Sequence, residues 1–523
     1  MRTSRLLAFA LAAFAANAAC AIERDFVHVD RVQFSGNTIF PEAELAALAR
    51  PLEGRDASVA DLEDLRQRIT RHYVDRGYVN SGAVIGDGAL ASGVLTVTVV
   101  EGRLEAVRVH GQERLRESYI ASRLNPHPSA PFNMEAMREQ FQLLLGDPLF
   151  ERLHANVVPG PTPGTAFLDI EVVRALPYEA AIYANNYRPP SIGEYWGGVS
   201  GRVRNLTTFG DTLDASIEAP IQGGNHEPRG EVAWRVPVGP WHTDFSALWS
   251  RGRTSVIEEP ARVLDIVSDL TTMEAGIGQK VYENLRHRAA LGFTAARREN
   301  VSTLGGDRFS FLLGEPDGVT KIRSQRFWQE YSYREESGAV VLRSTFARNH
   351  NNFEDITGLP GVVETFAKTN RTWIGQAYAS HQFGVHDAQA WIRATWQHTT
   401  DHLVPLDALA LGGVNSVRGF RENQLLRDQG GFVNVDADAS VWSDAERQQS
   451  LRLGGYVDEG VGWNQGGEHL RIGSIGAALR ARWRRLRADL YVAVHRWRSD
   501  AVPRTSGALQ DHGVHFQVTW SVF

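Results

Sequence analysis

The chain has 523 residues, enough for about three ordinary domains or for one large barrel with smaller companions. Its formal net charge of −6 argues against a nucleic-acid partner, which would favour a basic surface. Beyond the N-terminal segment, no apolar run reaches the roughly 20 residues that a transmembrane helix needs, which excludes a helical membrane protein. A membrane β-barrel is still allowed, because its alternating strands keep the mean hydropathy low.

Residues 1–21 are predicted to be a cleaved signal peptide. A basic start precedes an apolar stretch at 6–16, and small residues then permit cleavage before Ile22 or three residues earlier. Cys20 is the only cysteine of the chain, so cleavage before Ile22 leaves a mature protein without one. A lipid anchor on Cys20 is the alternative, which Asn17 disfavours because an aliphatic residue is expected at that position.

Residues 26–175 contain one α+β pattern twice. A short alternating strand that ends in glycine occurs at 32–36 and again at 107–111. Each copy continues with a helical stretch whose apolar residues recur at three- and four-residue spacing, and each closes with a strand. The apolar helix faces are Leu62, Leu65, Ile69 and Tyr73 in the first copy and Met134, Met137, Phe141 and Leu144 in the second. Ser58 and Asp61 predict a capping box at the start of the first of these helices.

From residue 176 onward apolar residues alternate with polar ones, as in strands with one face toward lipid and the other toward water. Short connections alternate with long ones, which is typical of outer-membrane barrels. We therefore predict an all-β transmembrane barrel of about 16 antiparallel strands, preceded by two small α+β domains. The predicted strands are 176–187, 194–204, 210–219, 228–237, 241–250, 266–281, 285–298, 321–336, 338–348, 369–382, 386–398, 433–443, 450–459, 469–483, 486–496 and 513–523.

A glycine-rich connection of the predicted barrel carries a cationic motif. Its residues are Val417, Arg418, Gly419 and Phe420. An arginine in such a loop can fold inward and grip a carboxylate with its planar fork. A candidate acid lies downstream in a second motif, made of Tyr456, Asp458 and Gly460. In a water-filled lumen we expect the ion pair to be only partly desolvated and to contribute about 1–3 kcal/mol. The alternative is an ordinary outer loop with a solvated arginine.

Two tandem α+β units before a barrel, together with these two motifs, resemble the POTRA–barrel superfamily of outer-membrane proteins. Within it, the chain resembles the two-partner secretion transporters (TpsB type) of the hemolysin secretion/activation protein family. The implied domains are POTRA domain 1 at 22–103, POTRA domain 2 at 104–175, and an outer-membrane β-barrel at 176–523 with an inward-folded loop at about 399–432. Two generic α+β adaptor domains are the alternative for the N-terminal part.

The resemblance also implies roles for single residues. Arg418 is the loop-tip residue that pairs inside the lumen, and Asp458 is its partner on the inner wall. Tyr456 stands where the family usually has phenylalanine or glycine. Trp520 and the terminal Phe523 resemble the C-terminal signal by which the barrel-assembly machinery recognises its clients.

The function implied is a translocation pore in the outer membrane of a Gram-negative bacterium. It secretes, and can activate, a partner exoprotein in two-partner (type V) secretion, with periplasmic POTRA domains receiving the unfolded cargo. The other implied partners are outer-membrane lipid and the barrel-assembly machinery, without nucleic acid. A barrel-assembly insertase of the same superfamily and a passive porin are the alternatives. Two POTRA units favour secretion, because assembly factors usually carry more and a porin needs none.

Two expectations concern what the chain lacks. Phe26 already begins the first strand, which leaves no room for the N-terminal plug helix common in the family and makes the folded loop the one evident obstruction of the pore. Motifs of hydrolases, metalloproteases and phosphate-binding enzymes are missing from the sequence, so we expect no enzyme, no cofactor and no metal site.

Overall fold

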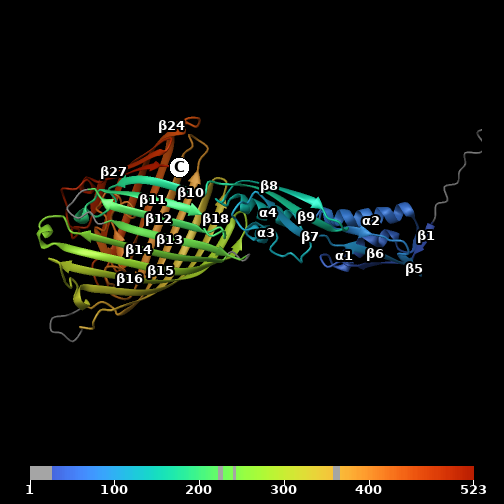
Figure 1. Cartoon of the computed structure of the whole chain (residues 1–523), viewed down its shortest axis with the longest axis horizontal. Coiled ribbons are helices and arrows are strands. Elements are labelled where there is room, and N and C mark those ends of the chain that lie inside the picture. Colours follow the sequence, from blue (N-terminus) through green and yellow to red (C-terminus); the bar gives the residue numbers. More distant parts are fainter. Residues whose placement is uncertain (1–25, 222–227, 240–242, 357–364) are drawn as a thin grey trace, which may run out of the picture. The chain divides into compact units, whose positions relative to one another are not determined.

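The computed structural model describes residues 26–221, 228–239, 243–356 and 365–523 (Figure 1). The predicted signal peptide, including Cys20, lies outside the described residues. The chain divides into two compact units. The first holds the described residues up to 110 together with 124–141 and 154–171, and the second holds 111–123, 142–153 and 172–523. Among the residues described, no helix is both long enough and apolar enough to cross a membrane.

The first copy of the α+β pattern folds around a sheet in the order β2-β6-β4. Helix α2 starts with the predicted capping box of Ser58 and Asp61. Its predicted apolar face is confirmed, because Leu65, Ile69 and Tyr73 are fully buried in one core with the sheet. The elements are β1 (Phe26–Val29), β2 (Arg31–Ser35), α1 (Glu42–Ala49), β3 (Arg55–Ser58), α2 (Val59–Val74), β4 (Gly82–Val84), β5 (Leu90–Ala91) and β6 (Val94–Val100).

Glu101, directly after β6, connects the sheet to the segment that leads into α1. Its carboxylate accepts hydrogen bonds from the Thr38 and Ile39 amides at 2.7 and 2.9 Å, and from the Tyr73 hydroxyl at 3.1 Å. Burial alone would raise the pKa of Glu101, but the hydrogen bonds to its charged form hold this pKa below its usual value. The charged carboxylate therefore helps to hold the end of the sheet, the segment before α1 and helix α2 together.

The second copy repeats the order of strand, helix, helix, strand and strand. Its sheet has the order β7-β9-β8, with β7 and β9 parallel. The predicted apolar helix face lies on α4, where Met137 and Leu144 are buried. The elements are β7 (Arg103–His110), α3 (Glu117–Leu124), α4 (Met134–Leu145), β8 (Phe150–Pro159) and β9 (Thr165–Arg174).

The second unit contains a closed antiparallel barrel (Figure 1). Its strands pair in chain order, and β28 returns to pair with β10. Sixteen strands span the barrel, which confirms the predicted fold class. The two-residue β17 (Asp307–Arg308) is not one of them, since β16 pairs directly with β18. The barrel strands are β10 (Tyr178–Asn185), β11 (Trp196–Arg204), β12 (Thr212–Pro220), β13 (Arg229–Val238), β14 (Thr243–Ser255), β15 (Ile266–Glu283), β16 (His287–Leu304), β18 (Val319–Glu335), β19 (Gly338–Asn351), β20 (Thr369–Gln382), β21 (Gln389–Thr399), β24 (Gln429–Asp444), β25 (Gln449–Trp463), β26 (Leu470–Trp483), β27 (Leu486–Arg498) and β28 (Val514–Ser521).

Successive residues of a barrel strand face opposite sides of the wall. In β24, Val433 and Val435 are 43% and 42% exposed, whereas Asn434 and Asp436 are 1% and 3% exposed. The apolar face therefore points outward, and the polar face points into the lumen. Because these polar side chains are buried, the lumen next to β24 is filled. What fills it is the connection between β21 and β24.

The connections of the barrel differ in length between its two rims. Tight turns such as 284–286, 336–337 and 484–485 lie on one rim, and the chain enters β10 and leaves β28 there. Long connections lie on the other rim, which we call the outer rim; those used below are 186–195, 256–265, 400–428 and 499–513. Short 3₁₀ helices lie at Arg50–Leu52, Pro190–Ile192, Ala261–Leu264, Pro316–Gly318 and Gln510–His512.

Candidate functional site

The connection between β21 and β24, residues 400–428, is called the folded loop below. Near its base it forms a short antiparallel pair of β22 (Leu409–Leu411) and β23 (Leu425–Arg427). The prediction that the loop extends to 432 is wrong, because Gly430 and Gly431 belong to the barrel ladder. A Cβ at Gly430 would lie 2.1 Å from the carbonyl oxygen of Val461. These glycines allow a close approach of two strands and do not mark a loop.

Arg418, at the tip of the folded loop, is held between two carboxylates of the barrel wall. Its Nε and Nη2 atoms donate to the two oxygens of Asp458, both at 2.7 Å. Its Nη1 and Nη2 atoms donate to the oxygens of Asp436 at 2.7 and 2.8 Å. The backbone N–H of Arg418 also donates to Asp458 at 2.8 Å. We call this arrangement the inner anchor; it uses both sides of the guanidinium fork.

The inner anchor is buried. The side chains of Arg418, Asp436 and Asp458 are 5%, 4% and 0% exposed, so the expectation of a partly desolvated pair is wrong. The physical reason is that aromatic rings cover the cation: the guanidinium carbon lies 3.9 Å from the ring centre of Tyr456 and 5.1 Å from that of Tyr491. Tyr456, which departs from the family pattern, thus supplies a cation–π contact.

Beyond the two carboxylates of β24 and β25, each of the next three strands also contributes one side chain to the loop tip. Ser474 of β26 donates to the carbonyl oxygen of Arg418 at 2.6 Å. Arg496 of β27 donates to the carbonyl oxygen of Gly419 at 2.9 Å, and the Gly419 N–H donates to His515 of β28 at 3.2 Å. The tip therefore lies against five consecutive strands, inside the barrel.

The glycines of the two motifs leave space for this close packing. Gly419 has φ +86°, and a Cβ there would lie 2.7 Å from the Cβ of Ala493. Gly460 of the wall faces the loop, because its Cβ would lie 2.8 Å from Cγ2 of Val417. Val417 and Phe420 are themselves buried. They share a small apolar core with Leu409, Leu411, Leu425, Leu470, Ile472 and Val502.

The two predicted motifs thus meet, but several contacting residues did not emerge from the sequence. For Asp436 the sequence offers only its place on the polar face of an alternating strand; its register opposite Tyr456 comes from the structure. Ser474, Arg496 and His515 are single polar residues on three further strands, and nothing local distinguishes them. In the part of the chain that the structure describes, no group of three His, Cys, Asp or Glu side chains is placed to bind a metal ion.

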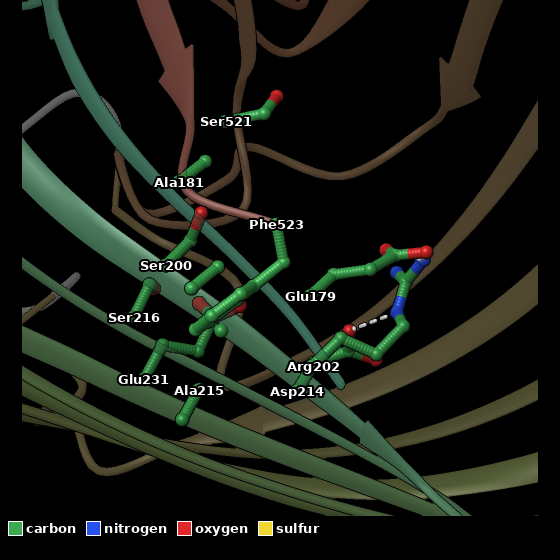
Figure 2. A pocket seen from close by; sticks show the side chains of 12 residues that line it. Glu179, Ala181, Ser200, Arg202, Asp214, Ala215, Ser216, Glu231, Ser521 and Phe523 are labelled. Atoms are coloured by element: carbon green, nitrogen blue, oxygen red, sulfur yellow. Dashed lines mark hydrogen bonds and ion pairs between the residues drawn. The ribbon is translucent and has the colours of Figure 1, made fainter. Parts of the chain in front are cut away.

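The predicted C-terminal residues lie apart from the folded loop. Strand β28 ends at Ser521, two residues before the predicted end, and Trp520 is on its outer face, 46% exposed. The ring of Phe523 lies 5.3 Å from that of Tyr178. Phe523 also lines a cavity of about 490 Å³ on the barrel wall, beside Ser200 and other residues of β11 and β12 (Figure 2). Phe523 thus lies two residues beyond the end of β28 and contacts the first barrel strand through Tyr178.

Comparisons with known proteins match both parts of the chain. Residues 27–102 match the family model of the ShlB-type POTRA domain, and residues 164–482 match that of haemolysin secretion/activation protein ShlB/FhaC/HecB. Outer membrane transporter CdiB of Escherichia coli O6:K15:H31 (strain 536 / UPEC) is 23% identical over 432 residues, which cover 79% of this chain and 69% of that protein.

Solved structures share the fold. CdiB from Escherichia coli superimposes with a TM-score of 0.71 at 18% identity, covering 96% of this chain and 92% of that one. CdiB from Acinetobacter baumannii gives 0.63 at 14% identity, covering 95% and 90%. The second family model covers more than half of the chain, including the folded loop and both carboxylates of the inner anchor. The chain therefore belongs to the haemolysin secretion/activation protein family ShlB/FhaC/HecB, and it is an outer-membrane transporter of the two-partner secretion type.

Proposed function

We propose that this transporter passes an unfolded exoprotein from the periplasm through its barrel to the cell surface, and that the folded loop closes the pore between export events. The observation that carries the proposal is the inner anchor. Arg418 joins the folded loop to two strands of the wall through five hydrogen bonds. Such contacts hold the loop in one position, and breaking them frees the lumen without unfolding the barrel.

The orientation follows from the topology of the barrel. With sixteen strands, both ends of the barrel segment lie on the rim of tight turns. We assign this rim, the POTRA domains at 22–103 and 104–175, and the cargo entrance to the periplasm, and the outer rim of the 176–523 barrel to the cell surface. Outer-membrane lipid surrounds the apolar outer face. The barrel-assembly machinery recognises the last strand, with Trp520 and Phe523. In this role the chain needs no enzymatic activity and no cofactor.

The POTRA units present edge strands on which an extended polypeptide can pair. Strand β8 hydrogen-bonds with β9 on one side, and no described residue pairs with its other edge. The edge of β2 is less open, because the Val32 N–H already donates to Glu53 at 2.9 Å. Backbone pairing along β8 would tolerate varied cargo sequences. We infer that β8 is one contact for the exoprotein, and that the first POTRA unit supplies further contacts that export also requires.

We expect the protein to fractionate with outer membranes and to migrate on gels differently before and after heating, because a closed barrel resists cold detergent. Membrane fractionation followed by electrophoresis of heated and unheated samples checks this. Recovery of the protein in the soluble periplasmic fraction would remove the barrel assignment.

Deletion of residues 26–103 should abolish secretion and leave barrel insertion intact, because the barrel sequence begins only at 176 and the POTRA units act on cargo. The measurement is the amount of exoprotein in the medium, compared with a full-length control at equal membrane levels. Heat-modifiable mobility of the deletion variant reports that its barrel has formed. Normal export by this variant would contradict the assigned role of the POTRA domain.

A further inference from the structure

Arg421 lies three residues beyond Arg418 and forms a second ion-pair cluster with entirely different partners. Its Nε and Nη2 atoms donate to the two oxygens of Asp511 at 2.7 and 2.8 Å. Its Nη1 atom donates to the two oxygens of Glu258 at 2.8 and 3.0 Å. Because Arg418 and Arg421 share no carboxylate, either cluster can break while the other persists.

The partners of Arg421 lie on the outer rim and not on the barrel wall. Asp511 belongs to the connection 499–513, and Glu258 belongs to the connection 256–265. Arg421 therefore joins the folded loop to two outer connections at once, one on each side of it in chain order. We call this cluster the outer anchor.

Asp511 is built to receive this arginine. Its side chain is 2% exposed, and it also accepts hydrogen bonds from the Thr505 hydroxyl at 2.5 Å and the Ala508 N–H at 2.9 Å. These contacts fix the position of the carboxylate inside its own connection before Arg421 arrives. A fixed, buried carboxylate binds an arginine fork with little loss of side-chain freedom.

The neighbouring residues extend the same joint. The backbone N–H of Glu422 donates to the Gln510 side chain at 2.9 Å. Gln510 in turn donates to the carbonyl oxygen of Arg188 at 2.7 Å, in the connection 186–195. This hydrogen bond ties the connection 499–513 to the neighbouring outer connection 186–195. The connection 499–513 therefore stays with the rim when the folded loop moves.

We propose that the outer anchor is a second, independent restraint on the folded loop, and that the pore opens only after both anchors have released. Arg421 is thus a positioning residue, which acts through the loop that it holds. This inference rests on the proposed function of the loop as a closure of the pore. The outer anchor adds a second point of release, at the cell surface, whereas the inner anchor faces the lumen.

The two anchors differ in their access to solvent, which makes them separable by experiment. Glu258 is 38% exposed, while both carboxylates of the inner anchor are almost fully buried. Salt screens exposed charges over about 10 Å at 0.1 M and about 3 Å at 1 M, whereas buried pairs are screened much less. Raising the ionic strength should therefore weaken the Glu258 half of the outer anchor, while the buried pair of Arg421 and Asp511 and the inner anchor are affected less.

The test uses the full-length protein in planar lipid bilayers and measures the fraction of time in the open state at low and high KCl. Arg421→Ala should raise this fraction by about tenfold, as expected for loss of a charge-assisted pair, and should flatten its dependence on salt. Arg421→Lys keeps the charge without the fork and should restore part of the salt dependence. Arg427→Ala is the matched control, since Arg427 lies in the same loop but donates to the backbone oxygen of Leu426.

Combining the two anchors gives the sharper measurement. Independent restraints add in free energy, so the open fraction of Arg418→Ala/Arg421→Ala should rise by the product of the two single effects, until it saturates. Suppose that Arg418→Ala raises the open fraction but Arg421→Ala matches the wild type in open fraction and salt dependence. This result would overturn the outer anchor and leave the proposed function of the loop standing. If neither arginine variant changes the open fraction, the proposed function of the loop fails as well.

Correct folding is checked by heat-modifiable mobility of each variant. Should Arg421→Ala not assemble, Glu258→Gln replaces it, because this change leaves the buried pair of Arg421 and Asp511 in place and removes only the exposed half of the cluster. The same loss of salt dependence is then expected, with a smaller rise in the open fraction. An unchanged salt dependence in Glu258→Gln contradicts the inference.

Discussion

Arg418→Ala is expected to open the pore and to lower secretion. Removing one member of a buried ion pair typically costs about 3–5 kcal/mol, because the remaining charges stay buried without a partner. Here the loss falls on the closed state of the loop, so we expect the closed-to-open ratio to drop by about hundredfold or more. Secretion falls because a loop without its anchor moves through the lumen and competes with the cargo for the same path.

The partners of Arg418 should give smaller effects than Arg418 itself. Asp458→Ala leaves the bidentate contact with Asp436, and Asp436→Ala leaves the contact with Asp458, so each single change removes only part of the inner anchor. The double variant Arg418→Ala/Asp458→Ala should be little worse than Arg418→Ala, since both changes remove one interaction. Exchanging the charges of Arg418 and Asp458 is not expected to restore function, because the new carboxylate would lie beside Asp436.

Single-channel recording and the amount of exoprotein in the medium measure these effects. Glu330→Ala is the matched control: Glu330 is an acid on the inner face of β18 and pairs with two arginines, Arg288 and Arg343, at 3.1 and 3.4 Å. It makes none of the loop contacts of the inner anchor. Strictly additive defects of Arg418→Ala and Asp458→Ala, or wild-type export from both, would show that the inner anchor does not hold the pore closed.

A disulfide between the loop and the wall should block export reversibly. Cγ2 of Val417 lies 2.8 Å from the position of a Cβ at Gly460, so the sulfur atoms of Val417→Cys/Gly460→Cys can meet after a small adjustment. If the loop must leave the wall before cargo passes, the oxidised double variant should secrete about tenfold less exoprotein or lower still, since a covalent bond removes the open state. Reductant should return secretion to the level of the single variants.

The background for this experiment is favourable. Cys20 is the one native cysteine, and it falls in the predicted signal peptide. The reduced form of the same protein, and the single variants Val417→Cys and Gly460→Cys under oxidant, control for packing changes in the wall. Undiminished export with a disulfide shown to be complete on gels would mean that cargo passes while the loop remains folded.

Much of the barrel was predictable because its period of two is a local property of each strand. The bounds of β20 agree with the prediction at both ends, and a strand was predicted at each of the sixteen barrel positions. Where the predicted strand ends differ from the observed ones, the difference has a physical cause. β14 and β16 continue to Ser255 and Leu304, through segments toward the outer rim where polar residues occupy both faces and the alternation fades.

The site was predictable only where a sequence motif marks it. Arg418 and Asp458 lie in short glycine-containing motifs that stand out from an alternating strand. Asp436 carries the same charge as Asp458, but it is one of several acids on the inner face of β24 and gains its role from register alone. Predicting the contacts of Ser474 and His515 would have required the order of the last strands around the barrel. Burial of the inner anchor was missed because it depends on rings from two different strands.

The contacts of the loop tip also impose an order on assembly. Asp458, Ser474, Arg496 and His515 all follow Arg418 in the chain, and His515 is separated from Gly419 by 96 positions. Neighbouring barrel strands, by contrast, pair with partners close in sequence, which form earlier because less chain entropy is lost. The full set of tip contacts can therefore form only on a wall that is complete through β28. A fully docked loop marks a finished barrel, and a chain truncated before its last strand would lack the contact between Gly419 and His515.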